Sequence, residues 1–141
     1  MVYEIYGPPD SGKSSYILSR AKEENKLCLY VNADFQLLDN LIDSSLYILN
    51  SNDVKTIKDA TNRLAGSIDT IIIDSLPMIT NEDHNTDKVI SDIQKIISIC
   101  NRNKIDLYII NQYRANNKCE DYTYYLSRLR LYYNKRIKVD K

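Results

Sequence analysis

The sequence holds few of the residues from which metal centres are built. It has a single histidine, His84, which we expect to be solvated, and three cysteines, Cys28, Cys100 and Cys119, which lie far apart. An odd number of cysteines without the short spacings of zinc ligands predicts no zinc site. Reduced cysteines fit a reducing compartment most simply, so we expect a cytoplasmic protein.

Long apolar runs are absent as well. No stretch approaches the ~18–20 apolar residues that a membrane-spanning helix needs, so we expect no membrane partner. The first residues already form a strand before a glycine-containing loop, so we expect no leader peptide. The hydrophobic content of 43% and charged content of 27% are typical of a globular protein. The length of 141 residues suits one domain, residues 1–141.

Tryptophan is missing and phenylalanine occurs once, whereas tyrosine occurs 12 times. The net charge is zero, but it is divided unevenly along the chain. Residues 1–113 carry 11 Lys/Arg and 16 Asp/Glu, a balance of −5, and residues 114–141 carry 8 and 3, a balance of +5. The basic segment is either a solvated surface or a surface for phosphate-rich partners.

A phosphate-binding loop is the most informative pattern that is present. The sequence reads G-x-x-x-x-G-K-S directly after an apolar stretch, which is the Walker A pattern between a strand and a helix. Backbone N–H groups of such a loop and the positive end of the following helix point at phosphate oxygens. We therefore predict binding of ATP with Mg²⁺ through Gly7, Pro8, Pro9, Asp10, Ser11, Gly12, Lys13, Ser14 and Ser15, with the Ser14 hydroxyl as a Mg²⁺ ligand.

Apolar strands alternate with amphipathic helices along the rest of the chain. We expect strands at residues 2–6, 26–31, 45–49, 68–74 and 105–111, and helices at residues 13–24, 35–42, 54–64 and 86–103. Tyr16, Ile17 and Ala21 should face inward, and Ser51 or Asn52 should cap the third helix. Residues 124–133 and 136–140, with a turn at 134–135, predict an antiparallel hairpin. The fold class is thus α/β, with three layers, a mostly parallel sheet and a C-terminal antiparallel hairpin.

Three polar side chains follow predicted strands and complete the site. Asp34 follows the second strand, Asp74 ends the strand at 68–74, and Gln112 follows the strand at 105–111. The carboxyl ends of parallel strands meet at one edge of a sheet, where ligands bind. We expect these side chains to converge on Lys13, as phosphoryl transfer requires.

These motifs together resemble the RecA/RadA recombinase superfamily, and in particular its small archaeal paralogue RadB. The resemblance is carried by the loop at Gly7–Ser15, by Ile72-Ile73-Asp74-Ser75 and by Ile109-Ile110-Asn111-Gln112, and it covers nearly the whole chain. It implies a RecA-like core in which the strand before Gln112 lies between the loop strand and the Asp74 strand. Asp74 would then hold Mg²⁺ through water, and Gln112 would contact the γ-phosphate.

The resemblance also assigns a general base. Asn32-Ala33-Asp34 stands where the family has Asp-x-Glu, so Asp34 would be the base, with a side chain one methylene shorter. We therefore expect slow ATP hydrolysis by Asp34, Gln112 and Lys13, in an accessory or regulatory role in DNA recombination or repair. Expected partners are weakly bound single-stranded DNA, through residues 112–122 and the basic hairpin, and a recombinase or another protein.

Two other functions remain open. Small nucleoside or nucleotide kinases also begin with such a loop, but no arginine-bearing lid is visible between Asp74 and Ile105. The protein would otherwise be a non-catalytic module whose bound ATP sets a binding state. Because the sequence starts six residues before the loop, we expect no N-terminal DNA-binding domain of the kind that recombinases of this superfamily carry.

Overall fold

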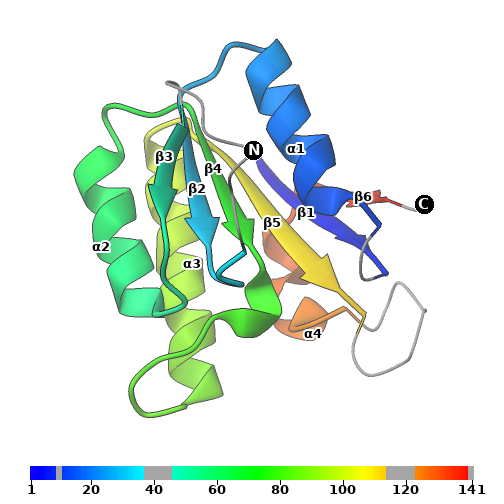
Figure 1. Ribbon diagram of the computed structural model, residues 1–141. Coiled ribbons are helices and arrows are strands. Elements are labelled where there is room, and N and C mark those ends of the chain that lie inside the picture. The colour runs from blue at the N-terminus through cyan, green and yellow to red at the C-terminus, as the bar shows by residue number, and fades with distance from the viewer. Residues whose placement is uncertain (9–10, 37–45, 114–122, 140–141) are drawn as a thin grey trace.

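A parallel sheet forms the centre of the molecule. The computed structural model describes residues 1–8, 11–36, 46–113 and 123–139 (Figure 1). Within these residues, six strands pair in the order β3-β2-β4-β5-β1-β6, and every pair is parallel. The strands are β1 (Val2–Gly7), β2 (Cys28–Asn32), β3 (Leu46–Leu49), β4 (Thr70–Asp74), β5 (Asp106–Gln112) and β6 (Lys135–Lys138).

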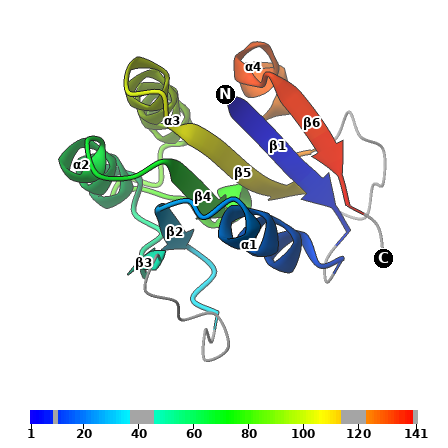
Figure 2. The same cartoon turned by 90° about the horizontal axis from the view of Figure 1, so that it is seen from above.

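Helices cover both faces of this sheet. The helix α1 (Lys13–Glu23) lies on one face, and α2 (Val54–Leu64) and α3 (Thr86–Arg102) lie on the other, where the short α4 (Leu126–Leu129) also packs (Figure 2). A large apolar cluster that includes Ile71, Ile73 and Ile109 fills the α2–α3 side. A smaller cluster around Ile17 and Ile72 lies beneath α1. The three-layer α/β fold expected from the sequence is confirmed.

The strand order places the loop strand beside the strand that ends in Gln112. The strand β5 lies between β1 and β4, with Gly7 opposite Gln112 and Asp74 opposite Ile110. All five residues of β4 are buried, which explains their near-continuous apolar sequence, since both faces of a parallel sheet are covered by helices. The strand order implied by the family resemblance is therefore confirmed.

The predicted C-terminal antiparallel hairpin is wrong. Its first half forms α4 and the 3₁₀ turn η3 (Arg130–Tyr132), while β6 pairs in parallel with β1. Asn134, expected in the turn, starts this pairing instead: Val2 N donates to Asn134 Oδ1 at 2.6 Å, and Asn134 N donates to Val2 O at 2.7 Å. Burial of Leu126 and Leu129 gives the short helix its core contacts.

Smaller differences concern helix faces and caps. Ile17 and Ala21 are buried, but Tyr16 is 41% exposed and does not face inward. The cap of α2 is Asp53, whose carboxylate accepts from Thr56 N at 3.0 Å, rather than Ser51 or Asn52. The helix expected at residues 35–42 lies mostly outside the described residues. Across the described ranges, the helices are too short or too polar to cross a membrane.

Candidate functional site

A cavity of about 540 Å³ opens at the carboxyl ends of the central strands, beside the start of α1. Its volume falls within the range of small-molecule sites. The predicted residues Lys13, Ser14, Asp34, Asp74 and Gln112 all line it. The fold therefore brings together predicted residues from four separate segments of the sequence. The full lining is Ser11, Gly12, Lys13, Ser14, Ser15, Asp34, Gln36, Asp74, Ser75, Ile110, Asn111 and Gln112.

The phosphate loop has the backbone geometry that its glycines permit. Gly12 has φ of +84°, a left-handed conformation that side-chain-bearing residues rarely adopt, and α1 begins at the next residue. Among the described residues, no side-chain hydrogen bond caps the helix at Gly12, and the start of a helix is where backbone N–H groups favour an anion. Pro9 and Asp10, which we predicted to contribute to this loop, lie outside the described residues.

Lys13 folds back over its own loop. Its Nζ donates to the carbonyl oxygens of Pro8 at 2.7 Å and Gly7 at 3.2 Å, and to Ser11 Oγ at 3.4 Å. These contacts hold the ammonium inside the curl of the loop. A phosphate oxygen carries charge and is therefore a stronger acceptor than a carbonyl. A phosphate bound in the loop would replace these carbonyls as the partner of the ammonium.

The two predicted Mg²⁺ ligands touch each other. Ser14 Oγ donates a hydrogen bond to Asp74 Oδ2, which joins the first turn of α1 to the end of β4. The described ranges contain no cluster of three or more His, Cys, Asp or Glu side chains that could hold a metal ion. One hydroxyl and one carboxylate instead fit Mg²⁺, which takes few protein ligands and completes its shell with water and substrate phosphates.

Asp74 is held by two residues that the sequence analysis did not identify. Its Oδ2 also accepts from the Tyr30 hydroxyl and from Gln36 Nε2, the latter at 3.3 Å. Burial raises the pKa of the Asp74 carboxyl above its ordinary value, and the hydrogen bonds from Ser14 and Tyr30 oppose that shift. Strand pairing explains the Tyr30 contact, since Tyr30 pairs with Ile72 and so lies on the same face of the sheet as Asp74.

Asp34, the predicted base, lines the cavity but is also engaged elsewhere. Its Oδ1 accepts from Ser75 N at 3.0 Å and from Ser75 Oγ at 2.9 Å, and its Oδ2 lies 3.1 Å from the same hydroxyl. A carboxylate offers about four lone-pair sites, so capacity for a water molecule remains. The contact nevertheless ties Asp34 to the residue after Asp74.

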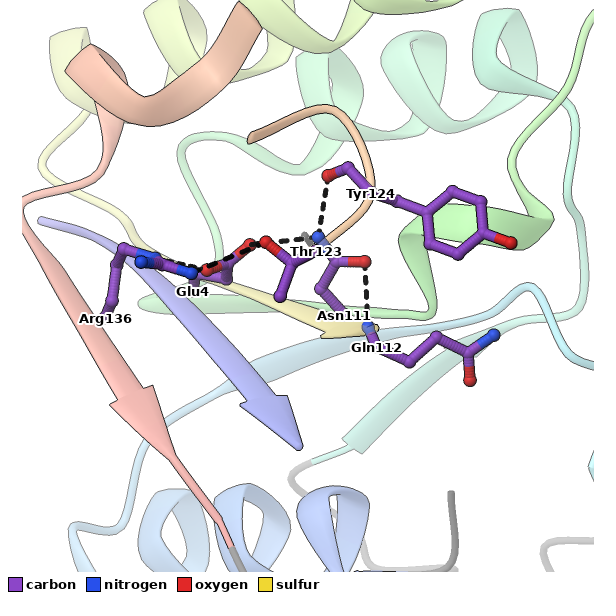
Figure 3. Close-up of polar contacts among 6 residues, drawn as sticks. All are labelled: Glu4, Asn111, Gln112, Thr123, Tyr124 and Arg136. Atoms are coloured by element: carbon purple, nitrogen blue, oxygen red, sulfur yellow. Dashed lines mark hydrogen bonds and ion pairs between the residues drawn. The ribbon is translucent and has the colours of Figure 1, made fainter. Parts of the chain in front are cut away.

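Gln112 ends β5 with its backbone fixed on both sides. Its N–H donates to Asn111 Oδ1 at 2.8 Å, and its carbonyl accepts from Tyr124 N at 3.3 Å. Figure 3 shows its side chain directed away from the polar residues that surround Asn111. Gln112 lines the cavity beside the phosphate loop, and its contact with a γ-phosphate stays a prediction.

Of the predicted DNA-contacting segment 112–122, only residues 112 and 113 are described. Arg114, Lys118 and Tyr122 lie outside the described residues. Tyr113 packs edge-on against Tyr6, with ring centroids 6.2 Å apart. Contact of this segment with DNA stays a prediction.

Comparisons with known proteins give the fold but no family. No protein-family model matches the chain, and no curated protein matches it. Among the solved structures that match is the crystal structure of the RadB recombinase, with a TM-score of 0.69 and 14% sequence identity, over 97% of this chain and 73% of that one. At this identity the likeness establishes the RecA-like fold alone.

Proposed function

We propose that the protein is a RecA-like ATPase core that binds ATP with Mg²⁺ and hydrolyses it slowly. The observation that carries the proposal is the convergence of Lys13, Ser14, Asp34, Asp74 and Gln112 on one cavity beside a phosphate loop. Phosphoryl transfer depends almost entirely on positioning and on neutralising charge, and these residue types supply both.

Each residue has a distinct role in this proposal. Loop N–H groups and the Lys13 ammonium hold the β- and γ-phosphates, and Ser14 and Asp74 hold Mg²⁺, which neutralises developing negative charge. Gln112 contacts the γ-phosphate. Asp34 accepts a proton as water attacks the γ-phosphorus and the bond to the β–γ bridging oxygen breaks, giving ADP and phosphate. The engagement of Asp34 with Ser75 and its short side chain both favour a low rate.

We infer an accessory or regulatory role in DNA recombination or repair, because one solved structure that shares this fold is a recombinase. Bound ATP would control contacts with a recombinase, with another protein or with single-stranded DNA. A non-catalytic ATP-dependent binding module is the second candidate. The specific observation in its favour is the Asp34–Ser75 contact, which occupies the predicted base.

One experiment separates these functions. ATP·Mg²⁺ is incubated with the protein, with and without a single-stranded oligonucleotide, and free phosphate is measured beside calorimetric affinity. Binding with slow phosphate release supports the ATPase, and binding without release supports the module. Phosphate transfer only to an added nucleoside or nucleotide would identify a kinase instead. Absence of nucleotide binding would refute the proposal as a whole.

A further inference from the structure

A buried polar cluster lies beside the candidate site, on the opposite face of the sheet. It consists of Glu4 on β1, Asn111 on β5, Thr123, and Arg136 on β6, and we call it the Glu4 cluster (Figure 3). Side chains alternate along a strand, so residues two positions apart share a face. Glu4 and Asn111 therefore lie on the face of the large apolar cluster, which contains Val2 and Ile109. Gln112 lies two residues after Ile110, which belongs to the smaller cluster beneath α1, so Gln112 lies on the opposite face.

The carboxylate of Glu4 is fully buried, and both of its oxygens accept hydrogen bonds. Its exposed fraction is 0%. One oxygen, Oε2, accepts from Asn111 Nδ2 at 2.9 Å and from Thr123 Oγ1 at 3.0 Å, and Oε1 accepts from Arg136 Nε at 2.6 Å. A charge buried in an apolar core is retained only with such partners. The carboxylate is therefore the common acceptor for groups from three parts of the chain.

Glu4 and the Tyr124 carbonyl together decide which way the Asn111 amide faces. An Asn side chain has one acceptor and two donors, and a carboxylate can only accept. With Nδ2 directed to Glu4 and to Tyr124 O at 2.8 Å, the oxygen Oδ1 is left to accept from Gln112 N at 2.8 Å. A reversed amide would set N–H groups against the Gln112 N–H and an oxygen against Glu4.

The Asn111 amide in turn fixes the backbone that carries Gln112. It holds the Gln112 N–H directly, and it holds Tyr124, whose N–H donates to Gln112 O at 3.3 Å. Gln112 lines the cavity from this fixed backbone. A carboxamide that is displaced by a fraction of an ångström makes a poorer hydrogen bond, because these bonds depend steeply on distance and angle.

We propose that Glu4 is a positioning residue for Gln112: as the acceptor that orients the Asn111 amide, it sets how well the protein distinguishes ATP from ADP. The inference deepens the proposed function and rests on it. Glu4 touches no nucleotide in this scheme, and its effect reaches the γ-phosphate only through Asn111 and Gln112.

Two matched double variants separate the effect of the hydrogen-bond acceptor for Asn111 from the effect of the Glu4–Arg136 ion pair. Glu4→Met/Arg136→Met removes the ion pair and also the acceptor for Asn111, whereas Glu4→Gln/Arg136→Met removes the ion pair but keeps a carbonyl oxygen for Asn111. Apolar replacement of a buried ion pair is often tolerated, so folding is expected. Calorimetry with ATPγS·Mg²⁺ and ADP·Mg²⁺ gives the ratio of the two affinities, with Gln112→Ala as the reference variant.

The acceptor should decide the outcome. We expect the Met/Met variant to lose about tenfold in the ATPγS-to-ADP ratio, as for a lost hydrogen bond to a charged group, and Gln112→Ala added to it should have no further effect. The Gln/Met variant should keep the parent ratio. Equal loss in both double variants would assign the effect to the ion pair, and equal retention would show that Glu4 does not act on Gln112. Either result overturns the inference.

A second measurement uses only the parent protein, so it does not depend on whether a variant folds. In NMR spectra of the parent, the Asn111 side-chain amide and the Gln112 backbone amide should shift together when ADP is replaced by ATPγS. A shift of Gln112 alone would overturn the inference while leaving the proposed function in place. A parent that binds neither nucleotide would overturn the proposed function, and the inference with it.

Discussion

Lys13 is the only cation in the loop sequence from Gly7 to Ser15, and its ammonium already lies inside the loop. We expect Lys13→Ala to weaken ATP·Mg²⁺ binding at least about tenfold, since charge-assisted hydrogen bonds are among the strongest in proteins. Isothermal calorimetry measures this change. Lys22→Ala, in an exposed position of the same helix, serves as the control and should bind as the parent does. Unchanged affinity in Lys13→Ala would contradict the assignment of the loop.

Tyr30 allows a similarly sharp test of the metal position. Tyr30→Phe removes only the hydroxyl that donates to Asp74, so Asp74 should be oriented less well toward Mg²⁺. We expect the Mg²⁺ concentration needed for half-maximal ATP binding to rise roughly five- to tenfold, the effect of one hydrogen bond to a charged acceptor. Affinity measured without Mg²⁺ should not change.

Tyr108→Phe is the matched control for this substitution. Tyr108 is also buried beneath α1, but it stacks on Tyr3, with ring centroids 4.7 Å apart, instead of contacting Asp74. Its substitution should leave the Mg²⁺ dependence as it is in the parent. If both phenylalanine variants shift the Mg²⁺ dependence equally, the effect is one of packing, and Tyr30 has no particular role at the metal position.

Asp34 is tested by its protonation chemistry. Asp34→Asn cannot accept a proton and should lose most ATP turnover while binding ATP nearly as before, whereas Asp34→Glu should be neutral or faster. Ser75→Ala removes the hydroxyl contact to both Asp34 oxygens, leaves the backbone N–H bond to Oδ1, and should not lower the rate. Phosphate release under saturating ATP measures all three variants. Turnover by Asp34→Asn at the parent rate would place the base elsewhere.

Among the elements, β6 restricts the phosphate loop most directly. A Cβ at Gly7 would lie 2.1 Å from the backbone oxygen of Val139, just beyond β6, so Gly7→Ala must displace one of the two segments. We expect this variant to melt several degrees lower, as for about 1–3 kcal/mol of overpacking, and to bind ATP more weakly. Thermal denaturation and calorimetry measure the two effects.

Gly66→Ala is the control for that substitution. Gly66 follows α2, its Cβ would meet nothing within 4 Å, and its φ is not in the left-handed region. The variant should melt at or slightly above the parent temperature, because alanine restricts the unfolded chain more than glycine does. A melting temperature in Gly7→Ala equal to that of Gly66→Ala would show that the end of β6 moves aside without cost.

The elements with a strong local pattern could be predicted from the sequence. Buried strands such as β4 are continuous apolar runs, and α3 repeats its apolar residues at helical spacing. The strand β6 could not be predicted in this way. Its partner β1 is 132 residues away at the Val2–Asn134 contact, and a local pattern contains no information about such a partner. Asn134 and Lys135 were therefore interpreted as a hairpin turn.

The same distinction between local pattern and distant pairing explains which residues of the candidate site could be predicted. Lys13, Ser14, Asp74 and Gln112 stand in motifs or at strand ends, and the sequence shows both. Tyr30 and Glu4 are ordinary strand residues whose roles depend on which strands are neighbours. Pairing across the sheet is decided by the assembled fold, so these two residues became visible only in the structure.

At the scale of the whole molecule, the charge distribution predicts weak binding of single-stranded DNA. The +5 balance of residues 114–141 attracts phosphate, and the −5 balance of residues 1–113 opposes it. Fluorescence anisotropy at low salt, with and without ATP, should show weak binding that Arg114→Ala/Lys118→Ala reduces. Because coupling between two ligands is reciprocal, DNA should change ATP affinity by the factor by which ATP changes DNA affinity. Binding that ignores both the substitutions and ATP would favour a protein partner.

The position of β1 between β5 and β6 also affects the order of folding. During synthesis β1 leaves the ribosome before either of its neighbours, β5 and β6, has been made. The backbone N–H and C=O groups along both sides of β1 then remain unpaired until β5 and β6 are made, and long-range parallel pairing is slow. A nascent chain therefore carries the phosphate-loop sequence long before it can form the cavity. The first segment of the site to be translated is among the last to acquire its native shape.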